Sequence, residues 1–192
     1  MIQLALPYLD GHEWLQRLRQ WDWPMLLESG HQERPAGEQL AADEEATLGA
    51  RFDIVVAEPQ IKYVTQGHNT HIWQASEDAW RCSQEDPFAL LKAQLAEIKQ
   101  ARHPEIPFAG GVLGYWSYDL GRRIEPLPVQ AQDDFPVPEM LVGLYAWAIV
   151  VDHHLQRCQL VSHGIACTAS ALQAVHDRLL QLTVSSQDTP PT

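Results

Sequence analysis

The apolar run at residues 141–151 (LVGLYAWAIVV) restricts the fold of this chain more than any other stretch. It is shorter than the ~18 apolar residues that a membrane-spanning helix requires. A continuous apolar run of this kind is typical of a strand that is covered on both faces. A turn expected at residues 152–156 would place residues 157–162 beside it as the next strand. The chain must therefore supply packing layers on both sides of this strand.

A second stretch, residues 110–128, predicts a strand that ends in a charged turn. Its apolar residues are interrupted by glycines, and prolines close it. We interpret the glycines as positions where another backbone comes close. The charged end, with Asp119, Arg122, Arg123 and Glu125, is dense enough for these side chains to pair with each other and fix the turn.

The rest of the chain predicts short strands and three amphipathic helices. The helices are expected to begin at Asp10, at the pair Asp86-Pro87 and at Thr168, because these residue types are common at helix starts. The acidic and polar residues 31–50 predict a solvated loop or a short surface helix. Hairpins rather than regular βαβ units favour an α+β fold. The remaining strands are expected at residues 4–9, 23–29 and 52–59, with a hairpin formed by residues 61–65 and 70–74.

Size and charge exclude several classes of function. The 192 residues suit one domain, because a chain of this order buries roughly 70% of its unfolded surface. Its formal net charge of −12 argues against nucleic acid or an anionic membrane surface as a partner. The first residues lack the basic and apolar regions of a signal peptide, so we expect a cytoplasmic protein.

The sequence contains no convincing catalytic constellation. His153, His154 and His163 form the best candidate metal cluster, but neighbouring residues on a strand point to opposite sides and no acidic ligand has a companion spacing. Cys158 and Cys167 lack an activating motif, so buried structural thiols are the favoured interpretation. The third cysteine, Cys82, leaves an odd number and no Cys-x-x-Cys spacing, which indicates neither a disulfide framework nor zinc.

Four segments, in order along the chain, resemble a known family. They are residues 23–30 (WPMLLESG), 51–59 (RFDIVVAEP), 114–128 (GYWSYDLGRRIEPLP) and 143–153 (GLYAWAIVVDH). They are similar to the amino-terminal domain of component I of aminodeoxychorismate synthase, the para-aminobenzoate enzyme of the chorismate-utilising family that also contains anthranilate synthase component I. The resemblance implies an α+β fold of layered antiparallel β-sheets flanked by helices.

A candidate ligand site lies at the end of the strand expected at residues 23–29. Glu28 and Ser29 offer a carboxylate and a hydroxyl, two groups that can hold the ammonium of an amino acid. In the family this position, with the segment that matches Arg51, Phe52 and Asp53, forms a tryptophan pocket. The resemblance thus implies that Leu27 and Phe52 line an indole site, that Glu28 and Ser29 meet the ammonium or backbone, and that Arg51 orders the wall. The alternative is that these are ordinary strand-end residues.

The chain departs from the family pattern between Ser29 and Arg51. Residues 38–50 form an acidic segment that is longer than the family pattern, and the remaining wall of the pocket is expected there. Glu28 and Ser29 resemble the anthranilate branch, whereas residues 119–125 resemble the para-aminobenzoate branch. The branch therefore stays open on these residues.

The resemblance also implies a place in a larger enzyme. That enzyme, a cytoplasmic transferase of folate biosynthesis, would convert chorismate and glutamine-derived ammonia into 4-amino-4-deoxychorismate with magnesium. We expect residues 1–183 to be its amino-terminal domain, inactive alone and without a cofactor, and residues 184–192 to be a linker-like tail. The expected partners are a carboxy-terminal chorismate-binding domain, a glutamine amidotransferase subunit and L-tryptophan. Two alternatives are a fragment of anthranilate synthase component I and a stand-alone amino-acid-binding regulator.

Overall fold

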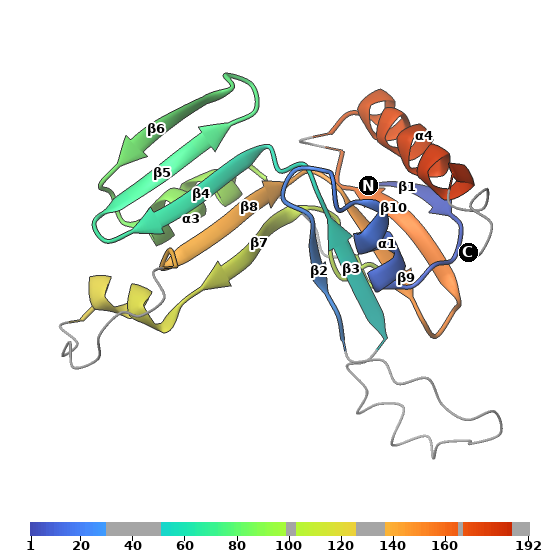
Figure 1. Ribbon diagram of the computed structural model, residues 1–192, viewed down its shortest axis with the longest axis horizontal. Helices are drawn as coiled ribbons and strands as arrows, with labels where there is room; N and C mark the ends of the chain where they lie inside the picture. Colours follow the sequence, from blue (N-terminus) through green and yellow to red (C-terminus); the bar gives the residue numbers. More distant parts are fainter. Residues whose placement is uncertain (30–50, 99–102, 126–136, 165–166, 186–192) are drawn as a thin grey trace, which may run out of the picture.

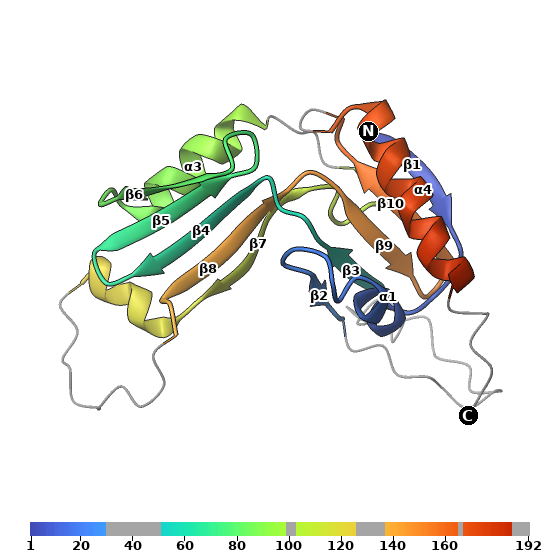
Figure 2. The same ribbon diagram turned by 45° about the horizontal axis from the view of Figure 1, so that its top comes forward.

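The chain folds into two antiparallel β-sheets flanked by helices (Figure 1). The computed structural model describes residues 1–29, 51–98, 103–125, 137–164 and 167–185. The β9 sheet has the strand order β1-β10-β9-β3-β2, and the β8 sheet has the order β6-β5-β4-β8-β7. In Figure 2 the two sheets slope away from each other like the sides of a roof. The α+β fold expected from the sequence is confirmed.

The β9 sheet is packed on both of its faces. Its strands are β1 (Ile2–Leu6), β10 (Arg157–Ser162), β9 (Ala148–Asp152), β3 (Phe52–Val56) and β2 (Met25–Leu27). On one face, α1 (Gly11–Arg17) and α4 (Ala169–Ser185) contribute to an apolar cluster that contains Trp14, Leu160 and Leu172. On the other face, a second cluster contains Val56, Val150 and Tyr145. Burial on both faces explains why the central strand β9 is apolar from Ala148 to Val151.

The β8 sheet is built around one apolar cluster. Its strands are β6 (Ala79–Ser83), β5 (Asn69–Gln74), β4 (Ile61–Gln66), β8 (Met140–Tyr145) and β7 (Gly111–Trp116). The helix α3 (Pro87–Glu97) contributes Leu91 to this cluster, which also contains Tyr63, Ile72 and Met140. A short 3-10 helix, η1 (Tyr118–Arg123), follows β7.

The apolar run at residues 141–151 is not one strand, and this prediction was wrong. β8 pairs with β4 and β7, whereas β9 pairs with β3 and β10, so the chain passes from one sheet to the other at Ala146 and Trp147. Trp147 is 4% exposed and packs edge-on against Trp21 with 6.0 Å between the ring centroids. Because the crossing is as buried as the two strands, the apolar pattern contains no sign of it.

Most of the smaller predictions are confirmed. The Asp10 carboxylate accepts a hydrogen bond from the Glu13 N–H, and Asp86 and Thr168 cap α3 and α4 in the same way. The hairpin of β4 and β5 has the expected register, and Arg122 pairs with Asp119 at 2.9 Å. The strand β6 was missed, and the first strand begins and ends earlier than expected.

Some expectations fall on residues that the structure does not describe. Residues 31–50, residues 126–136 of the proline-rich connection and residues 186–192 of the expected tail lie outside the described residues. The helix α4 continues to Ser185, two residues into the tail expected at 184–192. Within the described part of the chain, no helix is both long enough and apolar enough to span a membrane.

Candidate functional site

A polar cavity of about 320 Å³ lies beside the ends of β3 and β9. The loop after β1 and the start of α1 form its other walls. α1 can approach because its first residue is Gly11, where a Cβ would lie only 2.8 Å from Asp53 Oδ2. The cavity is lined by Tyr8, Leu9, Asp10, His12, Glu13, Glu28, Asp53, His153 and Gln156.

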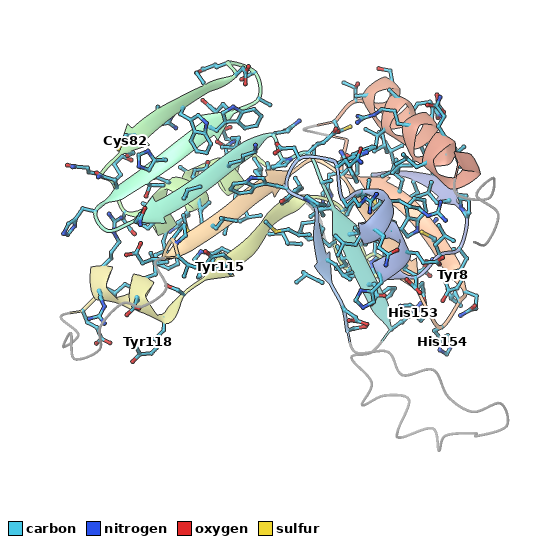
Figure 3. The ribbon with its side chains drawn as sticks, in the orientation of Figure 1. Tyr8, Cys82, Tyr115, Tyr118, His153 and His154 are labelled. Atoms are coloured by element: carbon cyan, nitrogen blue, oxygen red, sulfur yellow. The ribbon has the colours of Figure 1, made fainter. Side chains whose placement is uncertain are left out.

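The most buried polar groups of the cavity form one hydrogen-bonded chain. Asp53 Oδ2 lies 2.7 Å from His153 Nε2, and both side chains are buried. His153 Nδ1 lies 3.0 Å from the Tyr8 hydroxyl, which accepts a hydrogen bond from the Gln156 amide. Figure 3 shows Tyr8 and His153 at the same end of the β9 sheet. A buried carboxylate needs such partners, because an isolated buried charge is strongly unfavourable.

The cavity wall is acidic. Four carboxylates line it, and the described lining residues include no lysine or arginine. Glu28 Oε2 lies 3.3 Å from His12 Nε2, and both side chains are substantially exposed. Four carboxylates with only histidines as basic neighbours favour a cationic group such as an ammonium.

The five residues predicted as a ligand site lie on two faces of the β9 sheet. Leu27 pairs with Ile54, and side chains alternate along a strand, so Leu27 and Phe52 point to the face opposite the cavity. Of the five, Glu28 alone lines the cavity. The structure therefore separates the expected indole wall from the expected carboxylate.

Arg51 lies on the same face as Phe52. Its guanidinium donates two hydrogen bonds to the Asp152 carboxylate, at 3.1 and 2.7 Å, and stacks over the Phe52 ring at 4.6 Å from its centroid. Leu27 is 49% exposed. This face thus combines an exposed leucine, an aromatic ring and a fixed cation.

Ser29 joins the two faces. Its N–H donates a 3.4 Å hydrogen bond to Asp53 Oδ1. Its Oγ is buried and has no hydrogen-bond partner among the described residues. A buried hydroxyl without a partner costs about 1–3 kcal/mol, so a group that hydrogen-bonds to this oxygen would be favoured.

Neither buried cysteine is activated as a nucleophile. Cys158 lies on the buried strand β10, and burial raises the pKa of its thiol to about 12. Burial likewise raises the pKa of Cys167, so both thiols are poor nucleophiles near neutral pH. Among the described residues, no group of three or more His, Cys, Asp or Glu side chains could hold a metal ion.

Sequence reasoning missed most of the cavity. Tyr8, His12 and Gln156 belong to a loop, a helix and a turn that are far apart in the sequence, and no spacing connects them. Asp53 had a usable signal, because a carboxylate inside an otherwise apolar strand must have a buried partner. His153 was considered only as a metal ligand, whereas it pairs with Asp53.

Comparison with known proteins identifies the family. The family model described as chorismate binding enzyme matches residues 39–191. Because this match covers more than half of the sequence, the chain belongs to the chorismate binding enzyme family.

Individual relatives narrow the comparison. Aminodeoxychorismate synthase component 1 of Escherichia coli K12 is 38% identical over 153 residues, which are 79% of this chain and 30% of the relative. Anthranilate synthase component 1 of Mycolicibacterium smegmatis is 32% identical over 103 residues, or 53% of this chain and 20% of the relative. The chain thus spans less than a third of the length of these relatives.

A solved structure supports the fold. The crystal structure of anthranilate synthase component I from Streptococcus pneumoniae TIGR4 superposes with a TM-score of 0.55 at 20% sequence identity. The superposition covers 86% of this chain and 34% of the Streptococcus pneumoniae chain. The layered sheets are therefore the fold of this family.

Proposed function

We propose that this chain is the amino-terminal, non-catalytic part of an aminodeoxychorismate synthase component 1. The observation that carries the proposal is the 38% identity to the Escherichia coli enzyme over 79% of the chain. The anthranilate synthase relative is less identical and matches a shorter part of the chain. The complete enzyme would form 4-amino-4-deoxychorismate, for para-aminobenzoate and folate synthesis, from chorismate and ammonia.

The proposed enzyme has further parts. A chorismate-binding domain on the carboxy-terminal side would hold the substrate, and a glutamine amidotransferase subunit would supply the ammonia. Magnesium belongs to the complete enzyme in this proposal, because a hard divalent cation suits carboxylate oxygens. The described residues include no group of three or more candidate metal ligands. The proposal therefore places the magnesium ligands in the chorismate-binding domain.

We further propose an amino-acid site at the end of β2, with L-tryptophan as the ligand. Leu27 and Phe52 supply an apolar wall, and the Arg51 guanidinium beside them is 41% exposed and can meet a carboxylate. The unpartnered Ser29 hydroxyl can bind the ligand's polar end. Glu28 lines the acidic cavity behind this wall and favours a nearby ammonium.

A chimaera tests the proposed branch. The segment of Escherichia coli aminodeoxychorismate synthase component 1 that matches this chain is replaced by this chain, and the product is expressed in a strain that lacks the enzyme. We expect growth without para-aminobenzoate. The matched control places this chain in an anthranilate synthase component 1 and asks for growth without tryptophan. Growth of the control chimaera alone would favour the anthranilate branch.

A direct assay tests the proposed absence of catalysis in this part. The purified chain is incubated with chorismate, magnesium and ammonium, and the products are separated by chromatography. We expect no 4-amino-4-deoxychorismate from this chain and measurable product from the chimaera. Formation of the product by the chain alone would overturn the non-catalytic role.

A further inference from the structure

The Asp53 carboxylate connects two segments that are distant in sequence. Oδ2 lies 2.7 Å from His153 Nε2, and Oδ1 accepts the 3.4 Å hydrogen bond from the Ser29 N–H. Ser29 lies two residues beyond the end of β2, an edge strand of three residues. So short a strand contributes few ladder hydrogen bonds, and the Asp53 carboxylate adds one more backbone contact just beyond its end.

His153 makes the corresponding connection to Arg51. It follows β9 directly, and its N–H donates a 2.9 Å hydrogen bond to the Arg51 carbonyl. Its neighbour Asp152 holds the Arg51 guanidinium through the two side-chain bonds. The turn that contains His153 is itself fixed, because the Gln156 amide donates to both the His153 carbonyl and the Tyr8 hydroxyl.

Neither buried side chain lies on the face that carries Leu27 and Phe52. Asp53 alternates with Phe52 along β3 and faces α1, where a Cβ on Gly11 would touch it. A ligand on the Leu27 face would therefore lie beside the Arg51 guanidinium and next to Ser29, and would not meet Asp53 or His153.

We propose that Asp53 and His153 are positioning residues for an amino-acid ligand at the end of β2. Asp53 fixes Ser29, and His153 fixes both Asp53 and the backbone of Arg51, so the hydroxyl and the guanidinium face the ligand in one set arrangement. The inference rests on the amino-acid site proposed above. It adds a buried pair on the opposite face of the sheet that controls affinity without contacting the ligand.

Two substitutions at one position separate positioning from charge. Asp53→Ala removes both acceptors, so the Ser29 N–H and His153 Nε2 lose their hydrogen bonds to this carboxylate. Asp53→Asn keeps an oxygen for the Ser29 N–H and turns an amide N–H toward His153 Nε2, which accepts it in the other imidazole tautomer. The conservative variant therefore keeps the connection and loses only the charge.

The experiment measures L-tryptophan affinity by isothermal titration calorimetry on the folded chain. We expect Asp53→Ala to weaken binding about tenfold, which corresponds to about 1.4 kcal/mol. Asp53→Asn should stay within about threefold of the unsubstituted chain. The matched control is Ser162→Ala, which removes a buried 2.7 Å hydrogen bond to the Ala146 carbonyl from the same sheet and should leave the affinity unchanged.

A double mutant shows whether Asp53 acts through Ser29. If it does, adding Ser29→Ala to Asp53→Ala should weaken binding by less than the product of the two separate effects. Equal binding by the unsubstituted chain and Asp53→Ala, or fully multiplicative effects, would overturn the positioning role and leave the amino-acid site standing. A folded, unsubstituted chain that binds no L-tryptophan would overturn the site itself and the inference with it.

Discussion

The two sheets differ in how many large apolar side chains they leave exposed. Both bury hydrogen-bonded polar groups, as with Asp53, Asp152 and Ser162 in the β9 sheet and Thr65 with Thr70 in the β8 sheet. The β8 sheet and the helices beside it leave more large apolar side chains in contact with solvent. Figure 3 shows Tyr115 and Tyr118 at the outer end of that sheet. Its exposed large side chains include Trp80, Phe88, Leu95, Tyr115, Trp116 and Tyr118.

This difference affects how rigidly each sheet can hold the residues of a site. Buried hydrogen-bonded groups have few alternative arrangements, so the β9 sheet can hold site residues at fixed distances. In the β8 sheet, exposed apolar residues line a groove of about 410 Å³ between α3 and β7. Apolar contacts are not directional, so they do not fix these side chains in one arrangement. The candidate site accordingly lies on the β9 sheet.

The largest expected effect comes from truncating the doubly packed sheet. Ile149→Ala removes a fully buried side chain from the centre of β9 and should lower the free energy of unfolding by about 2–5 kcal/mol. Trp116→Ala on β7 truncates a side chain that is 43% exposed and should cost less than about 1 kcal/mol. Urea denaturation followed by circular dichroism measures both values. Equal losses in the two variants would contradict the contrast between the sheets.

A smaller effect is expected at the ion pair of Arg51 and Asp152. Burial alone would raise the pKa of Asp152, but hydrogen bonds from Arg51 and from the N–H groups of Leu155 and His154 outweigh it and hold the pKa below its ordinary value. The charged form therefore stabilises the fold above the unfolded pKa of about 3.9. This contribution disappears as the pH falls through the lower, folded-state pKa.

Arg51→Gln tests this ion pair. It should cost about 1–3 kcal/mol near neutral pH, because a buried carboxylate loses its main donor, and the cost should shrink as the pH falls below about 4. The control is Arg178→Gln, which breaks the more exposed two-bond pair with Glu58 and should cost at most about 1 kcal/mol. Denaturation curves over a pH series give the comparison. A cost for Arg51→Gln that does not change with pH would show that the charge of Asp152 does not provide this stabilisation.

Sequence patterns predicted local structure well and the site poorly, for a physical reason. The caps at Asp10, Asp86 and Thr168 use side chains within three residues of their targets, so the signal is local. The crossing at Ala146 and Trp147 depends on which strands pair with β8 and β9, and the run itself is apolar on both sides of the crossing.

The same distinction applies to the candidate site. Leu27, Glu28 and Ser29 could be named as candidates from the sequence because they are contiguous at a strand end. The pairing of Asp53 with His153 joins residues 100 positions apart, and neither identity predicts the other. What the sequence could predict was that a carboxylate within β3 needs a buried partner. It could not predict which face of the sheet would hold that partner.

The junction of the two sheets offers a third test. Lys62 on β4 lies 2.6 Å from the Asp22 carboxylate, and its ammonium stands 4.2 Å from the Trp73 ring centroid and 5.3 Å from that of Trp23. Lys62→Met keeps most of the apolar stem and removes the charge. We expect a loss of about 1 kcal/mol in denaturation experiments, from the cation–π contacts and the ion pair together. An unchanged or increased stability would mean that desolvation of Lys62 offsets those contacts.

Substituting a cysteine is expected to have the smallest effect on stability. The cysteines also show the largest difference in solvent accessibility between the two sheets. Cys82 lies exposed on β6, the outer strand of the β8 sheet, and Cys158 is 2% exposed on β10 between β1 and β9. Burial raises the pKa of the Cys158 thiol to about 12, so almost no thiolate is present near neutral pH. Cys82→Ser should change the free energy of unfolding by less than about 0.5 kcal/mol.

Iodoacetamide labelling followed by mass spectrometry measures the difference in accessibility between Cys82 and Cys158. The native chain should take one label, at Cys82, and the chain in denaturant should take a label at each of its cysteines. Cys82→Ser should remove the native label. Native labelling of Cys158 at the rate of Cys82 would show that β10 becomes accessible without global unfolding. In that case the β9 sheet would not be the rigid support that the candidate site requires.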